Sequence, residues 1–141
     1  MIREPVQARP EATGRTSFIT VRAEARAVKR VRDFVAEVHG HALGSEALYL
    51  AQTVAGELAT NAVRYGGTET VIVRTYESAE GPVIEVVDRG CRMPELRGPS
   101  EDATSGRGLW IVEMLAARWG CTPPADGEKV VWAVVKISAR R

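Results

Sequence analysis

An acid and an amide lie four residues apart in the segment ELATNAVRYGG, residues 57–67. At about 100° per residue of α-helix, Glu57 and Asn61 fall on the same face, one turn apart. A carboxylate can accept a proton or orient a water, and an amide oxygen is a hard ligand of the kind that Mg²⁺ prefers. The pair could therefore place a base beside a metal-bound phosphate.

The helix predicted around this pair changes character along one strip. The strip consists of Leu50, Val54, Glu57, Asn61 and Arg64. A separate stripe predicted to face the core consists of Leu48, Ala51, Ala55, Leu58 and Ala62. Two interpretations stay open: the polar half of the strip lines a pocket, or Glu57 and Arg64 lie at a solvated edge where Asn61 helps to end the helix.

Two other segments could complete a nucleotide site. In SGRGLWIV, Gly106 and Gly108 flank Arg107 at the expected start of a helix, where free N–H groups favour a phosphate. Asp88 ends a β-branched run and could accept a hydrogen bond from an exocyclic amine such as that of adenine, with Gly90 allowing close backbone approach. Each feature alone could equally be an ordinary turn, so the prediction rests on their combination.

Composition narrows the class of protein. The 141 residues suit one domain, and 19 Lys and Arg against 18 Asp and Glu give no field that would attract nucleic acid or an anionic membrane. No run approaches the roughly 20 apolar residues of a membrane span. Cys91 and Cys121 are expected to be thiols. We expect a cytoplasmic protein with a flexible leader over residues 1–15, a domain over 16–138 and a tail over 139–141.

The order of predicted elements indicates an α/β (α+β) two-layer sandwich with helices on one face of a mixed, mostly antiparallel sheet. Strands are predicted over 16–23, 69–77, 81–88 and 127–137, and helices over 23–38, 45–65 and 106–120. The segment 89–105 has no sustained periodicity and is predicted to be a functional loop. Gly66 and Gly67 are expected to end the second helix.

The segments ELATNA, VVDRG and SGRGLWIV, in this order, resemble the N, G1 and G2 boxes of the histidine-kinase-like ATPase superfamily. Within it, ELATNAVRYG and GRGLWIVEMLAARWG look like the anti-sigma-factor serine/threonine kinase branch, of the RsbW and SpoIIAB type, and especially its single-domain actinobacterial regulators. The resemblance covers residues 17–137. It implies the Bergerat fold, with about three helices on one sheet face, and ATP or ADP with Mg²⁺ as ligands.

The resemblance also implies roles for individual residues. Asn61 would hold Mg²⁺, Glu57 would be the catalytic base, Asp88 would recognise the adenine amine, and the loop over 91–105 would be the ATP lid. The implied nucleotide-binding set is Asn61, Arg64, Asp88, Gly90, Arg92, Thr104, Ser105, Gly106, Arg107, Gly108 and Leu109.

The chain departs from the family pattern at several positions. Arg92 stands where the G1 box has a second glycine, and Thr104 and Ser105 stand where kinases tend to have an arginine. Arg107, or Arg92 and Arg97, could take over contact with the terminal phosphate. Arg64 stands where many relatives carry histidine.

The resemblance implies a regulator that sequesters a sigma factor and phosphorylates a Ser or Thr of a small STAS-type antagonist, and that forms a homodimer. The alternatives are an ATP-sensing module without kinase turnover and a detached histidine-kinase catalytic domain. The basic residues Arg26, Lys29, Arg30 and Arg32 of the first helix could form a protein interface or a solvated face.

Overall fold

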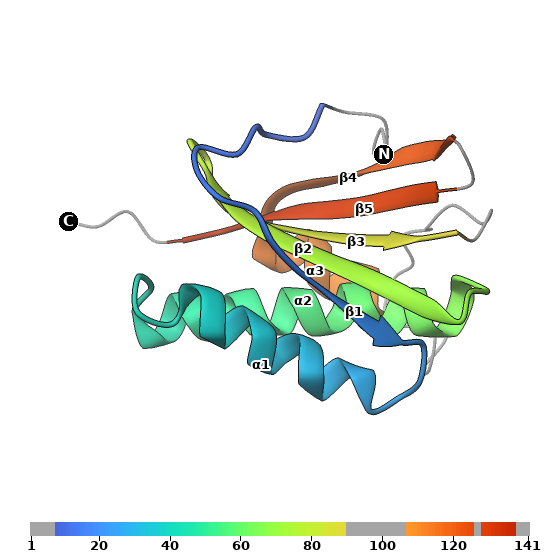
Figure 1. Ribbon diagram of the computed structural model, residues 1–141. Helices are drawn as coiled ribbons and strands as arrows, with labels where there is room; N and C mark the ends of the chain where they lie inside the picture. Colours follow the sequence, from blue (N-terminus) through green and yellow to red (C-terminus); the bar gives the residue numbers. More distant parts are fainter. Residues whose placement is uncertain (1–7, 90–106, 126–127, 138–141) are drawn as a thin grey trace.

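In the part of the chain that the structure describes, the protein is a two-layer α+β sandwich, with three helices on one face of a five-stranded sheet (Figure 1). The computed structural model describes residues 8–89, 107–125 and 128–137. The elements, in chain order, are β1 (Ser17–Arg22), α1 (Ala27–His39), α2 (Ser45–Tyr65), β2 (Thr70–Ser78), β3 (Gly81–Asp88), α3 (Arg107–Leu115), β4 (Ala116–Ala125) and β5 (Glu128–Val135). This architecture confirms the predicted fold class.

The strands lie in the order β1-β2-β3-β5-β4, and each of the four pairings is antiparallel. The predicted hairpin is present: β2 and β3 pair from Ile72 with Val87 to Ser78 with Gly81. Gly81 has φ of 123°, which an L side chain rarely adopts, so glycine is required after the tight turn. The order leaves β1 at one edge of the sheet and β4 at the other.

The prediction of one helix over 106–120 was wrong. Helix α3 ends at Leu115, and the following residues form β4, which pairs with β5. Trp119, which lies within the predicted helix, is buried on this strand and donates its indole N–H to Glu113 Oε1 at 2.6 Å. The apolar spacing around Leu115 and Trp119 is compatible with a helix or a strand, and pairing with β5 favours the strand.

Pro123 and Pro124, which lie between the predicted helix over 106–120 and the predicted strand over 127–137, belong to β4. They lie where the pairing with β5 shifts between Thr122 and Ala125. Proline cannot donate to the ladder and is tolerated at such a shift in an edge strand.

The main core lies between the helices and the sheet. α1 contributes Val31, Phe34 and Val35 to it, and α2 lies between α1 and α3 and contacts β2, β3 and β5. A second apolar cluster lies on the other sheet face and consists of Tyr76, Val83, Val87, Val130, Trp132 and Val134. Within the described part of the chain, no helix combines the length and the apolar character that a bilayer crossing requires.

The chain before β1 contacts the sheet. The Tyr76 hydroxyl donates to the Pro10 carbonyl at 2.8 Å, and the Thr13 N–H donates to the Glu77 carbonyl at 2.9 Å. Arg9 Nη1 lies 3.3 Å from Glu85 Oε2, a carboxylate that also accepts from Arg74 Nε at 2.8 Å. These contacts place residues 9–13 along the end of β2 and the face of the sheet opposite the helices.

Candidate functional site

Helix α2 positions the acid and the amide. It runs from Ser45 to Tyr65, as predicted, and its core-facing residues are Ala51, Val54, Ala55, Gly56, Leu58, Ala59 and Ala62. Glu57 and Asn61 are half-buried, whereas Arg64 is exposed. The strip therefore starts inside the core at Val54 and leaves it gradually toward the C-terminal end of the helix. Glu57 and Asn61 lie at the boundary between apolar packing and solvent.

The end of α2 meets the end of β3. Asp88 is 3% exposed, and a Cβ placed on Gly66 would lie 3.1 Å from its Cγ. A residue with a side chain would push against the carboxylate, so glycine permits this close approach. The two glycines expected to end the helix thus differ: Gly66 keeps a right-handed conformation, and Gly67, with φ of 71°, has the left-handed one. Asn61, Gly66 and Asp88 are brought to one corner of the molecule.

Asp88 has a buried counter-ion that the sequence did not reveal. Asp88 is paired in register with Lys129 of β5, and Lys129 Nζ lies 3.6 Å from Asp88 Oδ1. Both side chains are almost fully buried, at 3% exposure for Lys129 and 2% for Asp88. Read locally, Lys129 is simply a polar residue at the start of a strand. The position of Lys129 opposite Asp88 depends on the register between β3 and β5, which a local sequence pattern does not specify.

Cys121 lies close enough to this ion pair to feel both charges. Burial raises the pKa of its thiol to about 11, with Lys129 acting to lower the value and Asp88 acting to raise it. Its side chain is a thiol, as predicted. Cys91 lies outside the described residues.

Helix α3 begins at Arg107, one residue after the predicted start, and Gly108 is its second residue. Leu109, assigned to the nucleotide set, is 1% exposed and belongs to the main core. The helix thus begins within the glycine-rich segment, as the phosphate-binding hypothesis requires. The remaining predicted residues, Gly90, Arg92, Arg97, Thr104, Ser105 and Gly106, lie outside the described residues, as does the predicted lid.

The donor set at this corner suits a hard metal ion that brings most of its own ligands. In the described ranges, no group of three His, Cys, Asp or Glu side chains is placed to hold an ion. A cation beside Asn61 would take one amide oxygen from that side chain and most other ligands from phosphate and water. Mg²⁺ is commonly bound in this way, whereas structural Zn²⁺ requires several protein ligands. The residues present therefore fit Mg²⁺ carried by a phosphate ligand.

Comparisons with known proteins agree with this geometry. A family model described as the histidine kinase-like ATPase domain matches residues 21–134. The structure of the RsbU and RsbW domains of Rv1364c from Mycobacterium tuberculosis superposes with a TM-score of 0.64 at 18% identity, covering 90% of this chain and 34% of that one. The chain thus spans about a third of that relative's length.

A second similar structure is the histidine kinase domain from the Erythrobacter litoralis EL346 blue-light activated histidine kinase. It has a TM-score of 0.47 and 17% identity, and the match covers 89% of this chain and 70% of that one. No curated protein gives a significant match.

Proposed function

Because the chain belongs to the histidine kinase-like ATPase domain family, we propose that it binds ATP with Mg²⁺ where α2, β3 and the start of α3 meet. We propose further that it transfers phosphate to a partner protein, as an anti-sigma regulator of the RsbW type. One observation carries the proposal: the end of α2 closes on the buried carboxylate of Asp88 through Gly66. That contact holds the Asp88 carboxylate, the proposed acceptor for the adenine amine, beside the helix that carries Asn61 and Glu57.

Each residue has a distinct binding role. The Asp88 carboxylate accepts a hydrogen bond from the adenine amine, in surroundings from which solvent is largely excluded. The Asn61 amide oxygen would hold Mg²⁺, which, when bound, neutralises charge on the phosphates. The first N–H groups of α3, at the positive end of the helix dipole, would hold the phosphates.

Glu57 is the base in the proposed transfer. Its carboxylate takes the proton of a Ser or Thr hydroxyl while that hydroxyl oxygen bonds to the terminal phosphorus of ATP. The bond between that phosphorus and the bridging oxygen breaks, and ADP leaves with the electron pair. A half-buried carboxylate suits this task, because it can be reached by the incoming hydroxyl and yet is held by a rigid helix.

The partners proposed are a sigma factor, which the protein sequesters, and a STAS-type antagonist, which it phosphorylates. This choice is supported by the fold shared with a protein that contains an RsbW domain and by the residues of the segments ELATNA, VVDRG and SGRGLWIV. A sensor that binds ATP without transferring phosphate is the second candidate, and it is favoured by Thr104 and Ser105 standing where kinases tend to have arginine.

Nucleotide binding is tested first, by titrating the fluorescent analogue mant-ATP with and without Mg²⁺. Asp88→Asn is expected to weaken binding at least about tenfold, which is about 1.4 kcal/mol. Asn61→Ala is expected to remove most of the Mg²⁺ dependence. Glu85→Gln is the matched control: Glu85 is an equally buried, ion-paired carboxylate on the same strand, but it points to the opposite sheet face. Equal losses for Asp88→Asn and Glu85→Gln would contradict the assignment.

Transfer is tested with labelled ATP, Mg²⁺ and recombinant STAS-type antagonists. Glu57→Ala is expected to retain mant-ATP binding and to abolish label on the antagonist. Unchanged labelling by Glu57→Ala would refute the assigned base. Nucleotide binding that depends on Asp88, without label on any antagonist, would favour the sensor, and acid-labile label would indicate phosphohistidine and hence the histidine-kinase alternative.

A further inference from the structure

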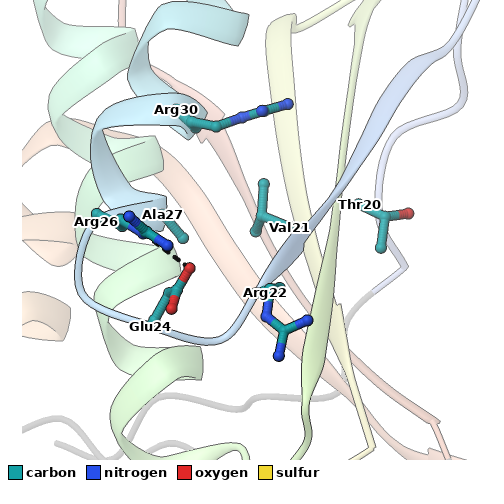
Figure 2. A pocket seen from close by; sticks show the side chains of 7 residues that line it. All are labelled: Thr20, Val21, Arg22, Glu24, Arg26, Ala27 and Arg30. Carbon is teal, nitrogen blue, oxygen red and sulfur yellow. Dashed lines mark hydrogen bonds and ion pairs between the residues drawn. The ribbon is translucent and has the colours of Figure 1, made fainter.

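A basic groove lies between β1 and the start of α1, and in the sheet β2 lies between β1 and β3. Its volume is about 430 Å³, within the range of about 300–1,000 Å³ that is usual for binding pockets. It is lined by Thr20, Val21, Arg22, Glu24, Arg26, Ala27 and Arg30. Figure 2 shows Arg30 extending from α1 toward the strand side, while Arg22 emerges from the end of β1.

The groove carries more positive charge than its surroundings balance. Three arginines line it against one acid, Glu24, whose Oε2 lies 3.0 Å from Arg26 Nε. The first turn of α1 holds no acid, and its N-cap, Arg26, makes no side-chain capping bond. Cations at the positive end of a helix dipole are locally unfavourable, and local rules tend to be broken where function requires it. A bound carboxylate would relieve this concentration of charge.

The outer edge of β1 offers backbone groups beside the same groove. Within the described residues β1 pairs with β2 alone. The Ala23 N–H donates to the Glu69 carbonyl at 2.8 Å, and this bond fixes the phase of the ladder. Because antiparallel bonding alternates along a strand, Ile19 and Val21 bond to β2, whereas the N–H and C=O groups of Phe18 and Thr20 point outward.

This edge lacks the features that usually prevent pairing. The residues from Ser17 to Val21 include no charged residue and no proline, and charge, proline and bulges are how edge strands are normally protected. The Phe18 side chain is 64% exposed. An exposed aromatic residue thus lies at one end of the edge, and the arginines lie at the other.

We propose that β1 accepts an extended acidic segment of a partner protein as an additional strand. The segment would lie about 4.8 Å from β1 and bond to the outward groups of Phe18 and Thr20. An apolar residue of the segment packs on Phe18. The carboxylates of the segment pair with Arg22 and Arg30, about 13 Å farther along the strand at 3.3 Å per residue. This inference does not depend on nucleotide binding or kinase activity.

The experiment uses two fluorescein-labelled probe peptides, one with four β-branched residues followed by four acidic ones and the other in reverse order, because either strand direction is compatible with the edge. Binding is measured by anisotropy. Arg22→Gln with Arg30→Gln is expected to weaken it at least about tenfold, whereas Lys29→Gln, which removes a charge from the same helix outside the groove, leaves it within about twofold. Thr20→Pro removes one outward N–H from an edge strand, where proline is tolerated, and is expected to weaken binding about fivefold or more.

Amide hydrogen exchange of the unmodified protein provides a readout that no variant can compromise. The saturating acidic peptide is expected to slow exchange at Phe18 and Thr20, with little change at Ile19 and Val21, which already bond to β2. Failure of both peptides to bind would overturn the proposal. So would binding without protection at Phe18 and Thr20, or equal competition by single-stranded DNA, because either result would indicate a general polyanion surface.

Discussion

Replacement of Lys129 by Met should lower the free energy of unfolding, because it removes the buried positive charge beside the Asp88 carboxylate at the candidate site. Lys129 Nζ and Asp88 Oδ1 are 3.6 Å apart with both side chains almost fully buried. At an effective dielectric constant of about 20, two unit charges at this distance attract by about 4–5 kcal/mol. Removing one partner of a buried pair typically costs about 3–5 kcal/mol. Because Met keeps the apolar stem, most of the loss should be electrostatic.

We therefore expect Lys129→Met to lower the free energy of unfolding by about 3–5 kcal/mol at pH 7, measured by urea denaturation.

Two comparisons make this prediction specific. Lys136→Met removes an exposed lysine just beyond the same strand and should change stability by less than about 0.5 kcal/mol. The double variant Asp88→Asn with Lys129→Met buries no charge and should recover most of the loss. A Lys129→Met protein within about 1 kcal/mol of wild type, or a double variant no more stable than Lys129→Met, would refute the electrostatic reasoning.

Two further predictions concern other parts of the fold. Gly120→Ala should lower the free energy of unfolding by about 1–3 kcal/mol in urea denaturation, because its Cβ would lie 2.6 Å from Trp132 Cζ2. Gly14→Ala is the control and should not lower it, because no atom lies within 4 Å of the added Cβ. Equal stabilities of the two variants would contradict the packing. Burial lowers the pKa of His39 while Glu77 opposes the change, so Glu77→Gln should lower that pKa further by NMR titration. A neutral buried histidine stabilises the folded protein above the unfolded pKa of 6.5, and that stability is lost as the pH falls toward the lowered folded pKa. Glu77→Gln should therefore steepen the loss of stability below pH 6.5. A raised pKa of His39 in this variant would contradict the geometry.

The histidine geometry explains the direction of the last effect. The Thr75 hydroxyl donates to the Val83 carbonyl at 2.7 Å, so it accepts from His39 Nε2 at 2.8 Å. His39 Nδ1 then faces Glu77 Oε2 at 3.2 Å. A carboxylate there favours a protonated ring, whereas the amide of Gln can donate to a neutral one.

Helix periodicity was sufficient to place α2 and its strip. Apolar residues recurring at helical intervals between Gly44 and Gly66 predicted the bounds Ser45–Tyr65, because both the period and the terminating glycines are properties of the local chain. The same local logic predicted the β2–β3 hairpin and the strand that ends at Asp88. The sequence also indicated that Glu57 and Asn61 share a face, since that follows from the rotation per residue alone.

The tertiary structure decided what no local pattern specifies. Residues 116–119 fit a helix or a strand, and pairing with β5 made them β4. The register of β3 against β5 brought Lys129 to Asp88, and the crossing of α2 over β3 made Gly66 a contact of the carboxylate. These relations join elements far apart in the chain, so they arise when the sheet and helices pack together. The residue types of the candidate site were therefore set by the sequence, whereas its buried ion pair and the closeness of its parts were set by packing.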